Sequence, residues 1–145
     1  MLPPAAPAPS STAPPDAVAK HEVSVLVVDD DEDIRDLLVE ILRGEGYSVA
    51  TATHGQEALE VLGTMSPRLI LLDLNMPVMG GIEFNDARLR DPILRTIPTI
   101  VMTAADRIQS RVAGLEVAGA VAKPIHLAQL LGLVARYCDD PGASS

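Results

Sequence analysis

Several residue types are scarce in this chain, and each scarcity excludes a class of protein. Cys138 is the only cysteine among 145 residues, which rules out an intrachain disulfide and a cysteine-rich zinc site. Aromatic residues make up 2% of the sequence, so a folded core has to be built from Val, Leu, Ile and Ala. No apolar run approaches the roughly 18 residues that a membrane-spanning helix needs, so no membrane insertion is expected.

Basic residues are also few: 11 Lys and Arg face 20 Asp and Glu, for a net charge of -9. Direct binding of nucleic acid requires a basic surface and is not expected. The acidic excess instead favours a bound cation or a basic partner surface. Lysine is the rarest charged residue, since nine of the basic residues are arginines and the two lysines are Lys20 and Lys123.

The two ends of the chain differ from its middle. Residues 1–21 are rich in Pro and Ala and carry almost no large apolar side chains, which predicts a disordered arm. This arm lacks the basic start and apolar centre of a signal peptide. Residues 139–145 are polar and are expected to form a flexible tail. Residues 22–138 remain as one domain of ordinary size.

Apolar periodicity within this domain alternates between strand and helix. Helical spacing predicts five helices, at about 31–44, 55–62, 82–90, 106–116 and 127–138. Ser66 and Pro67 are expected to end the second helix, and the third strand is expected to follow them. Such alternation is typical of an α/β fold, a five-stranded parallel sheet with helices on both faces. The predicted strands are 23–28, 47–52, 69–72, 99–102 and 120–122.

The third of these strands stands out because four branched apolar residues lead directly into Asp73, and Pro77 follows four residues later. Ligands collect at the carboxyl ends of the strands in open α/β sheets, so Asp73 is the candidate working carboxylate. The alternative is that Asp73 only caps a strand and begins a turn, as aspartate often does.

Polar side chains follow the other strands in the same way. Asp29 and Asp30 come after the first strand, Thr103 ends the fourth, and Lys123 ends the fifth. Carboxylates packed together with Asp73 suit Mg²⁺, which prefers oxygen ligands. An aspartate can also act as a nucleophile and form an aspartyl-phosphate. Lys123 would then neutralise a phosphoryl oxygen while Thr103 donates a hydrogen bond to another. The alternative for Lys123 is a surface lysine that precedes a proline by chance.

Five motifs in this order resemble the receiver domain of two-component response regulators, over residues 22–138. The resemblance implies a flavodoxin-like doubly wound (βα)5 fold with five helices. It also implies a cytoplasmic phosphoacceptor switch that catalyses its own phosphorylation and hydrolysis and is not an ordinary enzyme. The motifs are Asp29-Asp30-Asp31 after an apolar strand, Asp73 to Pro77, Met79-Gly80-Gly81, Thr103-Ala104 and Lys123-Pro124.

The same resemblance implies a role for each matching residue. Asp73 would accept a phosphoryl group from a histidine kinase or a His-phosphotransfer protein, and an unknown downstream protein would read the result. Thr103 and Lys123 would bind the phosphoryl group, and the bond from Lys123 to Pro124 would be cis. The implied Mg²⁺ ligands are Asp30 directly, Asp29 through water or by positioning, Asp73, and the backbone carbonyl of Asn75.

Two features depart from the family pattern. Ala120 stands where receivers usually carry an aromatic residue, three positions before the lysine. The interval from Thr103 to Lys123 is also a couple of residues shorter than usual, which predicts an abbreviated fourth helix or exit loop. We therefore expect the signal to leave the site through backbone movement around 103–107 or through another face of the domain.

Three functions remain open at this point. The first is a stand-alone response regulator that acts by protein–protein interaction or phosphorelay. The second is an aspartate-nucleophile phosphatase, but that class carries a second aspartate where this chain has Asn75. The third is a receiver-like interaction module that is never phosphorylated.

Overall fold

A computed structural model of the chain describes residues 21–75, 80–108 and 112–138. Residues 1–20 of the predicted arm, the tail 139–145, Pro77 and the centre of the predicted helix 106–116 lie outside these residues. His21, the last residue of the predicted arm, instead begins the first strand. No helix in the described ranges is long and apolar enough to cross a membrane. In chain order the elements are β1 (His21–Val28), α2 (Glu32–Gly44), β2 (Val49–Ala52), α3 (Gly55–Leu62), β3 (Met65–Asp73), α4 (Gly81–Arg90), the 3-10 helix η2 (Leu94–Thr96), β4 (Thr99–Ala104), the 3-10 helix η3 (Ala105–Arg107), β5 (Gly119–Lys123) and α6 (Leu127–Cys138).

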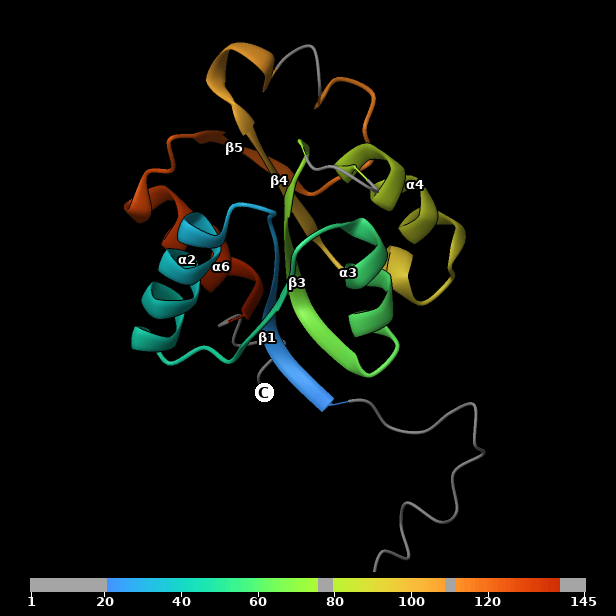
Figure 1. The fold of residues 1–145 in the computed structure, drawn as a ribbon, viewed down its shortest axis with the longest axis horizontal. Coiled ribbons are helices and arrows are strands. Elements are labelled where there is room, and N and C mark those ends of the chain that lie inside the picture. The colour runs from blue at the N-terminus through green and yellow to red at the C-terminus, as the bar shows by residue number, and fades with distance from the viewer. Residues whose placement is uncertain (1–20, 76–79, 109–111, 139–145) are drawn as a thin grey trace, which may run out of the picture.

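The five strands form one parallel sheet in the order β2-β1-β3-β4-β5. Helices α2 and α6 cover one face of the sheet, and α3 and α4 cover the other (Figure 1). This is the flavodoxin-like doubly wound order, so the predicted α/β fold with a parallel sheet is confirmed.

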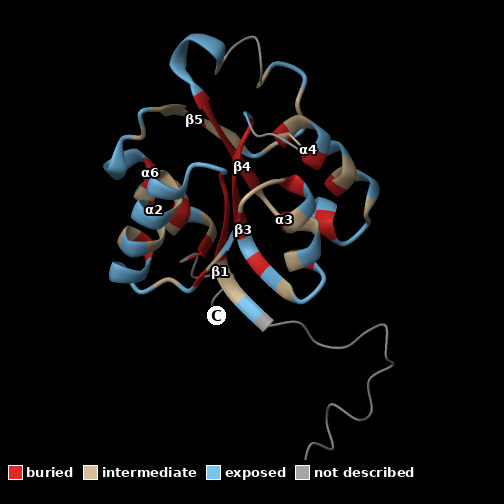
Figure 2. Cartoon of the chain, viewed as in Figure 1, coloured by how far each residue is buried: buried red, intermediate tan, exposed pale blue. Residues whose placement is uncertain are grey.

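Each strand contributes to two cores because successive side chains of a strand point to opposite faces. In β1, Val25 and Val27 belong to the core under α2 and α6, whereas Leu26 and Val28 belong to the core under α3 and α4. Figure 2 shows the central strands buried along most of their length, with exposed residues on the outer sides of the helices. Burial on both faces explains why these strands read as continuous apolar runs.

The predicted helix 106–116 is wrong over part of its length. Residues 105–107 form η3, and residues 113–118 are turn or irregular chain. Gly114 has φ of +83°, a left-handed conformation that an α-helix does not continue through. The structure therefore describes four α-helices where five were expected. The expected shortening of this connection agrees with the non-helical chain at 113–118.

Helix α3 ends at Leu62 as predicted, but the expectation that the third strand begins after Ser66 and Pro67 is wrong, because both residues belong to β3. Pro67 pairs with Val23 of β1, while the pairing of β3 with β4 begins only at Ile70. This part of β3 has one neighbouring strand, and a strand with a free edge tolerates the missing N–H of proline.

Candidate functional site

The register of the sheet brings the polar strand ends together at one edge. Val28 of β1 pairs with Leu72 of β3, so Asp29 and Asp73 follow at the same level. Asp73 itself pairs with Met102 of β4, and Lys123 of β5 pairs with Ala104. The chain leaves β1 toward β2 on one side and later returns to β3 on the other. The crevice between β1 and β3 is thus the switch point where doubly wound sheets bind ligands.

Lys123 connects the two buried carboxylates of this crevice. Its Nζ atom lies 3.2 Å from Oδ2 of Asp29 and 3.4 Å from Oδ1 of Asp73. The carboxylates are almost inaccessible, at 0% and 2% relative exposure, while the lysine side chain keeps 24%. The ammonium group therefore reaches inward from the rim and neutralises carboxylates that water does not reach.

Burial sets the protonation behaviour of Asp73. Loss of hydration raises the pKa of its carboxyl group to about 6, against an ordinary value of 3.8, and the charge of Asp29 adds to the rise. A hydrogen bond from the Asn75 amide and the charge of Lys123 act in the opposite direction. Burial also acts to lower the pKa of Lys123, but the two carboxylates outweigh it and raise that pKa. The lysine stays charged, whereas burial disfavours the charged form of Asp73.

The turn between β1 and α2 is built from aspartates. The Asp31 amide donates to Oδ1 of Asp29 at 2.9 Å, and Asp31 caps α2 by accepting from the amides of Asp33 and Ile34. Short acidic side chains suit this place because the first amides of a helix lack internal partners. Asp29 is fixed in this way, while Asp30 projects into solvent beside it.

The three carboxylates form a set that fits a metal ion. Asp29, Asp30 and Asp73 offer oxygen atoms that all lie within 4.8 Å of one another. Oxygen ligands of one octahedral Mg²⁺ lie at most about 4.2 Å apart, so the three carboxylates are close enough to bind one ion with little or no movement. Two buried carboxylates with one lysine between them also leave a negative charge that a cation would offset.

The structure also places the other predicted site residues, Thr103 and Asn75, near Asp73. Thr103 is buried in β4, one residue beyond Met102, the partner of Asp73, and it pairs with Ala122. The Asn75 amide donates to Oδ1 of Asp73 at 3.1 Å. The peptide bond between Lys123 and Pro124 is cis, as predicted. The residues predicted from four separate stretches thus gather at one edge of the sheet.

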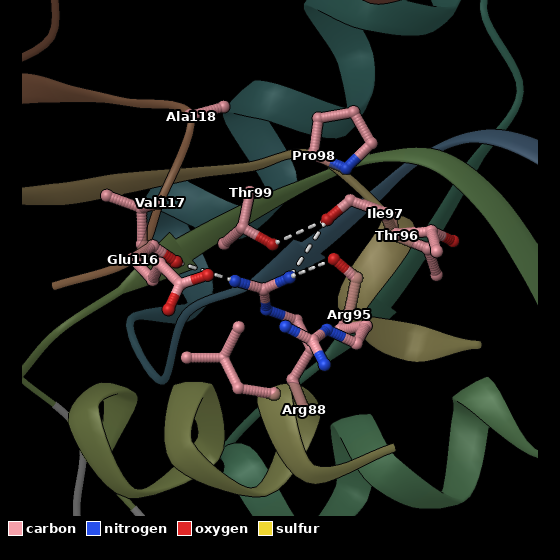
Figure 3. Close-up of a pocket in the computed structure, with 10 residues that line it drawn as sticks. Arg88, Arg95, Thr96, Ile97, Pro98, Thr99, Glu116, Val117 and Ala118 are labelled. Atoms are coloured by element: carbon pink, nitrogen blue, oxygen red, sulfur yellow. Dashed lines mark hydrogen bonds between the residues drawn. The ribbon is translucent and has the colours of Figure 1, made fainter. Parts of the chain in front are cut away.

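Two arginines that the sequence does not single out make specific contacts. Arg35 of α2 donates from Nη1 to the backbone carbonyl of Asp29 at 2.9 Å. Arg88 of α4 is 3% exposed and lies at the opposite edge of the sheet, at the base of a hollow of about 290 Å³ (Figure 3). It donates to Oδ1 of Asn85 twice and to the carbonyls of Arg95, Ile97 and Glu116. These bonds use all five guanidinium donors, so Arg88 ties three segments together and offers nothing to a ligand.

A second hollow lies beside the acidic crevice. It is apolar, has a volume of about 240 Å³, and is lined by α2 and by the chain from Lys123 to the start of α6. Leu37 and Leu127 border it with 54% and 41% exposure, which is high for large apolar side chains. An exposed apolar surface next to a reactive site is typical of a place where another molecule docks.

The fold and the crevice define a class: a doubly wound α/β domain with a cluster of three aspartates and a lysine at its switch point. The profile of the response regulator receiver domain matches residues 25–135. The chain therefore belongs to the response regulator receiver family of two-component signalling. Members of this family are phosphoacceptor switches and not ordinary enzymes, and histidine kinases or phosphotransfer proteins are their partners.

Individual relatives agree with this assignment. The chain is 39% identical over 120 residues to an uncharacterised 14.6 kDa protein of Leptolyngbya boryana, covering 81% of this chain and 91% of that one. It is 44% identical over 114 residues to the transcriptional regulatory protein PrrA of Mycobacterium tuberculosis, covering 76% of this chain and 47% of PrrA. The chain thus spans about half the length of PrrA, and the same holds for the response regulator MprA of Mycolicibacterium vanbaalenii.

Solved structures show the same fold. The chemotaxis response regulator CheY4 of Vibrio cholerae is 30% identical with a TM-score of 0.72, and the match covers 82% of this chain and 99% of CheY4. The receiver domain of a histidine kinase from Syntrophus aciditrophicus is 29% identical with a TM-score of 0.75, covering 82% and 92% of the two chains.

Proposed function

We propose that this protein accepts a phosphoryl group on Asp73 from a phosphohistidine, in a reaction that requires Mg²⁺. The observation that carries the proposal is the position of the Asp73 carboxylate, which is buried, 3.4 Å from Lys123, and within one cluster with Asp29 and Asp30. The phosphorylated domain then signals by binding another protein or by passing the phosphoryl group on.

The side chains divide the chemistry between them. A carboxylate oxygen of Asp73 attacks phosphorus, the P–N bond to the donor imidazole breaks, and the imidazole takes up a proton as it leaves. Asp29, Asp30, Asp73 and the Asn75 carbonyl would hold Mg²⁺, and the ion would supply positive charge to offset the charge of the phosphoryl oxygens. Lys123 moves from pairing two carboxylates to pairing a phosphoryl oxygen. Thr103 follows Met102, the strand partner of Asp73, and its hydroxyl donates a hydrogen bond to a second phosphoryl oxygen.

The apolar hollow between α2 and α6 supports a protein as the phosphodonor. A donor histidine has to approach Asp73 over the rim where Lys123 stands, and Leu37 and Leu127 lie next to that rim. A helix that carries the histidine can bury its own apolar side chains on these two leucines. Direct contact with nucleic acid forms no part of the proposal, because the chain carries a net charge of -9.

The test uses a small phosphodonor, acetyl phosphate, with and without Mg²⁺. Intact-mass spectrometry should show a gain of about 80 Da, the mass of one PO₃H group, only when Mg²⁺ is present. Asp73→Asn should abolish the gain, while Asp86→Asn, an exposed aspartate on α4, should leave it unchanged. An adduct that persists in Asp73→Asn would place the phosphoryl group elsewhere.

The second candidate, an interaction module that is not phosphorylated, rests on Ala120 at the position of the usual aromatic residue. The same experiment separates the two functions. The absence of any adduct with acetyl phosphate, and also with a phosphorylated histidine kinase, would favour the interaction module.

A further inference from the structure

Arg35 is a basic residue near the N-terminus of a helix, where acidic residues are preferred. It lies in the first turn of α2, where the helix dipole favours negative charge and where Glu32 and Asp33 obey that preference. A cation at this place gains nothing from the helix itself. Its position calls for a specific contact outside the helix.

That contact is the carbonyl oxygen of Asp29, which Nη1 of Arg35 reaches at 2.9 Å. Side chains of a helix lean toward its N-terminus, so the guanidinium extends back across the first turn to the end of β1. There the Asp29 carbonyl has left the sheet, since β1 ends at Val28. The bond thus joins the start of α2 to the start of the acidic turn.

The carbonyl of Asp29 belongs to the peptide unit that joins Asp29 to Asp30. Because this unit is planar, holding its oxygen also fixes the direction in which the chain enters Asp30. Asp29 has further hydrogen bonds: its backbone amide donates to the carbonyl of Ala52, and its carboxylate accepts from the Asp31 amide and from Lys123. Among the described residues, none hydrogen-bonds to the exposed Asp30 carboxylate, so its backbone determines where it points.

A neighbouring acid keeps the guanidinium in this region. The charge of Arg35 contributes to lowering the pKa of Glu57, after the larger effect of hydrogen bonds from Thr53. Oε1 of Glu57 accepts from both the amide and the hydroxyl of Thr53, which follows β2. Arg35 is therefore attracted by an acid that is itself fixed beside the ends of β1 and β2.

We infer that Arg35 is a positioning residue of the metal site: its bond to the Asp29 carbonyl orients the Asp29–Asp30 peptide so that both carboxylates face one Mg²⁺. This inference rests on the proposed function. Partners behind a metal's direct ligands commonly change metal affinity 10- to 100-fold when removed. Arg35 would act on binding of the metal without touching it.

A role of Arg35 through its charge and a role through positioning predict opposite changes in Mg²⁺ affinity for Arg35→Gln. If Arg35 acted only through its charge, its removal would relieve repulsion and Mg²⁺ would bind more tightly. If Arg35 positions the peptide, Mg²⁺ should bind about tenfold more weakly. Calorimetric titration with MgCl₂ measures this, and Arg43→Gln is the control, because Arg43 is exposed in the last turn of the same helix. Unchanged or tighter binding in Arg35→Gln overturns the inference.

Two further measurements keep the test decisive. Thermal unfolding without Mg²⁺ detects a purely structural role of Arg35. In that case Arg35→Gln would have a lower Tm and an unchanged Mg²⁺ affinity, and this result would overturn the inference. If Arg35→Gln does not fold, Arg35→Lys keeps the charge and loses the planar fork. Weaker Mg²⁺ binding than in the wild type then supports the inference, and equal binding overturns it. Failure of wild-type protein to form an adduct on Asp73 would reject the proposed function independently of these affinities.

Discussion

Gly81 lies directly against the backbone of Asp73. A Cβ atom on Gly81 would come within 2.5 Å of the Asp73 carbonyl oxygen and of the Leu74 Cα atom, which is closer than real Cβ atoms approach. The Gly81 amide also donates to the Leu74 carbonyl at 3.3 Å. Helix α4 thus begins in backbone contact with the candidate phosphoacceptor.

The first prediction concerns Gly81→Ala. The added methyl group has to push the backbone at Asp73 and Leu74 aside, since neither neighbour is the end of a flexible side chain. We expect about 1–3 kcal/mol of lost stability from overpacking. We also expect phosphorylation by acetyl phosphate to slow by at least about tenfold, because small displacements of reacting groups are costly.

Gly132→Ala is the matched control, because nothing lies within 4 Å of the position of its Cβ atom in α6. This change should preserve the rate and raise stability by up to about 1 kcal/mol. A wild-type phosphorylation rate in Gly81→Ala would show that the contact does not position Asp73.

The second prediction concerns Lys123. Replacement by Gln removes a charge that acts to lower the pKa of Asp73, so that pKa should rise further. The transferred phosphoryl group would also lose its cation, and we expect phosphorylation to slow about 10²-fold. Lys123→Arg should not restore the rate, because a planar guanidinium does not replace the compact ammonium between two buried carboxylates. Initial rates of phosphorylation, measured by intact-mass spectrometry, test this, and Arg136→Gln, an exposed change, is the control. A normal rate in Lys123→Gln would show that Lys123 takes no part in the reaction.

The third prediction follows from the raised pKa of Asp73 in protein without metal. The folded state holds the Asp73 proton up to about pH 6, whereas the unfolded chain releases it near 3.8. This contribution to stability is therefore present below about pH 3.8 and is lost as pH rises through 6, amounting to at most about 3 kcal/mol.

Urea unfolding in EDTA between pH 4 and 8 measures this effect, as the difference between wild type and Asp73→Asn. The Asn variant should be the more stable protein at neutral pH, and the difference should shrink as pH falls below 6. MgCl₂ should recover stability in the wild type more than in the variant. A difference that does not vary with pH would contradict the raised pKa.

The gathering of Asp29, Asp73 and Lys123 was predictable from sequence because it depends on strand polarity alone. Each follows an apolar run, and parallel strands place such ends at one edge. The structure adds the 3.2 Å and 3.4 Å contacts that make Lys123 the bridge between the two acids.

The roles of Arg35 and Arg88 were not predictable, because most of their acceptors are backbone carbonyls, which every residue possesses. Arg88 contacts residues 95, 97 and 116, and only the folded chain brings these together. The error at 106–116 has a related cause. Ile108, Val112 and Leu115 have helical spacing, and residues 108 and 112 are helical, but the left-handed conformation at Gly114 ends the pattern before Leu115.

The fourth prediction concerns Arg88→Met. Replacing the guanidinium leaves the buried Oδ1 of Asn85 and the carbonyl of Glu116 without this donor. The Ile97 carbonyl keeps its bond from the Thr99 hydroxyl. A buried acceptor without a partner costs about 1–3 kcal/mol, and the Oδ1 atom of Asn85 is such an acceptor, so we expect a loss of about 1–3 kcal/mol in urea unfolding. Arg90→Met, an exposed change two residues along α4, should cost less than about 0.5 kcal/mol. A loss below about 1 kcal/mol in Arg88→Met would show that these bonds do not hold the edge together.

The fifth prediction concerns how phosphorylation is reported outward. Ala120 lies in β5, is partly buried, and packs on the core under α3 and α4, so no large side chain there can move when Thr103 moves. With beryllofluoride and Mg²⁺ as a phosphoryl mimic, we expect the largest amide shift changes in ¹H–¹⁵N spectra at 103–107, with small changes along β5 and α6. Ala120→Tyr should extend the changes toward β5, because a ring would then be coupled to Thr103. Changes spread over β5 and α6 in the wild type would show that the signal crosses that face without an aromatic residue.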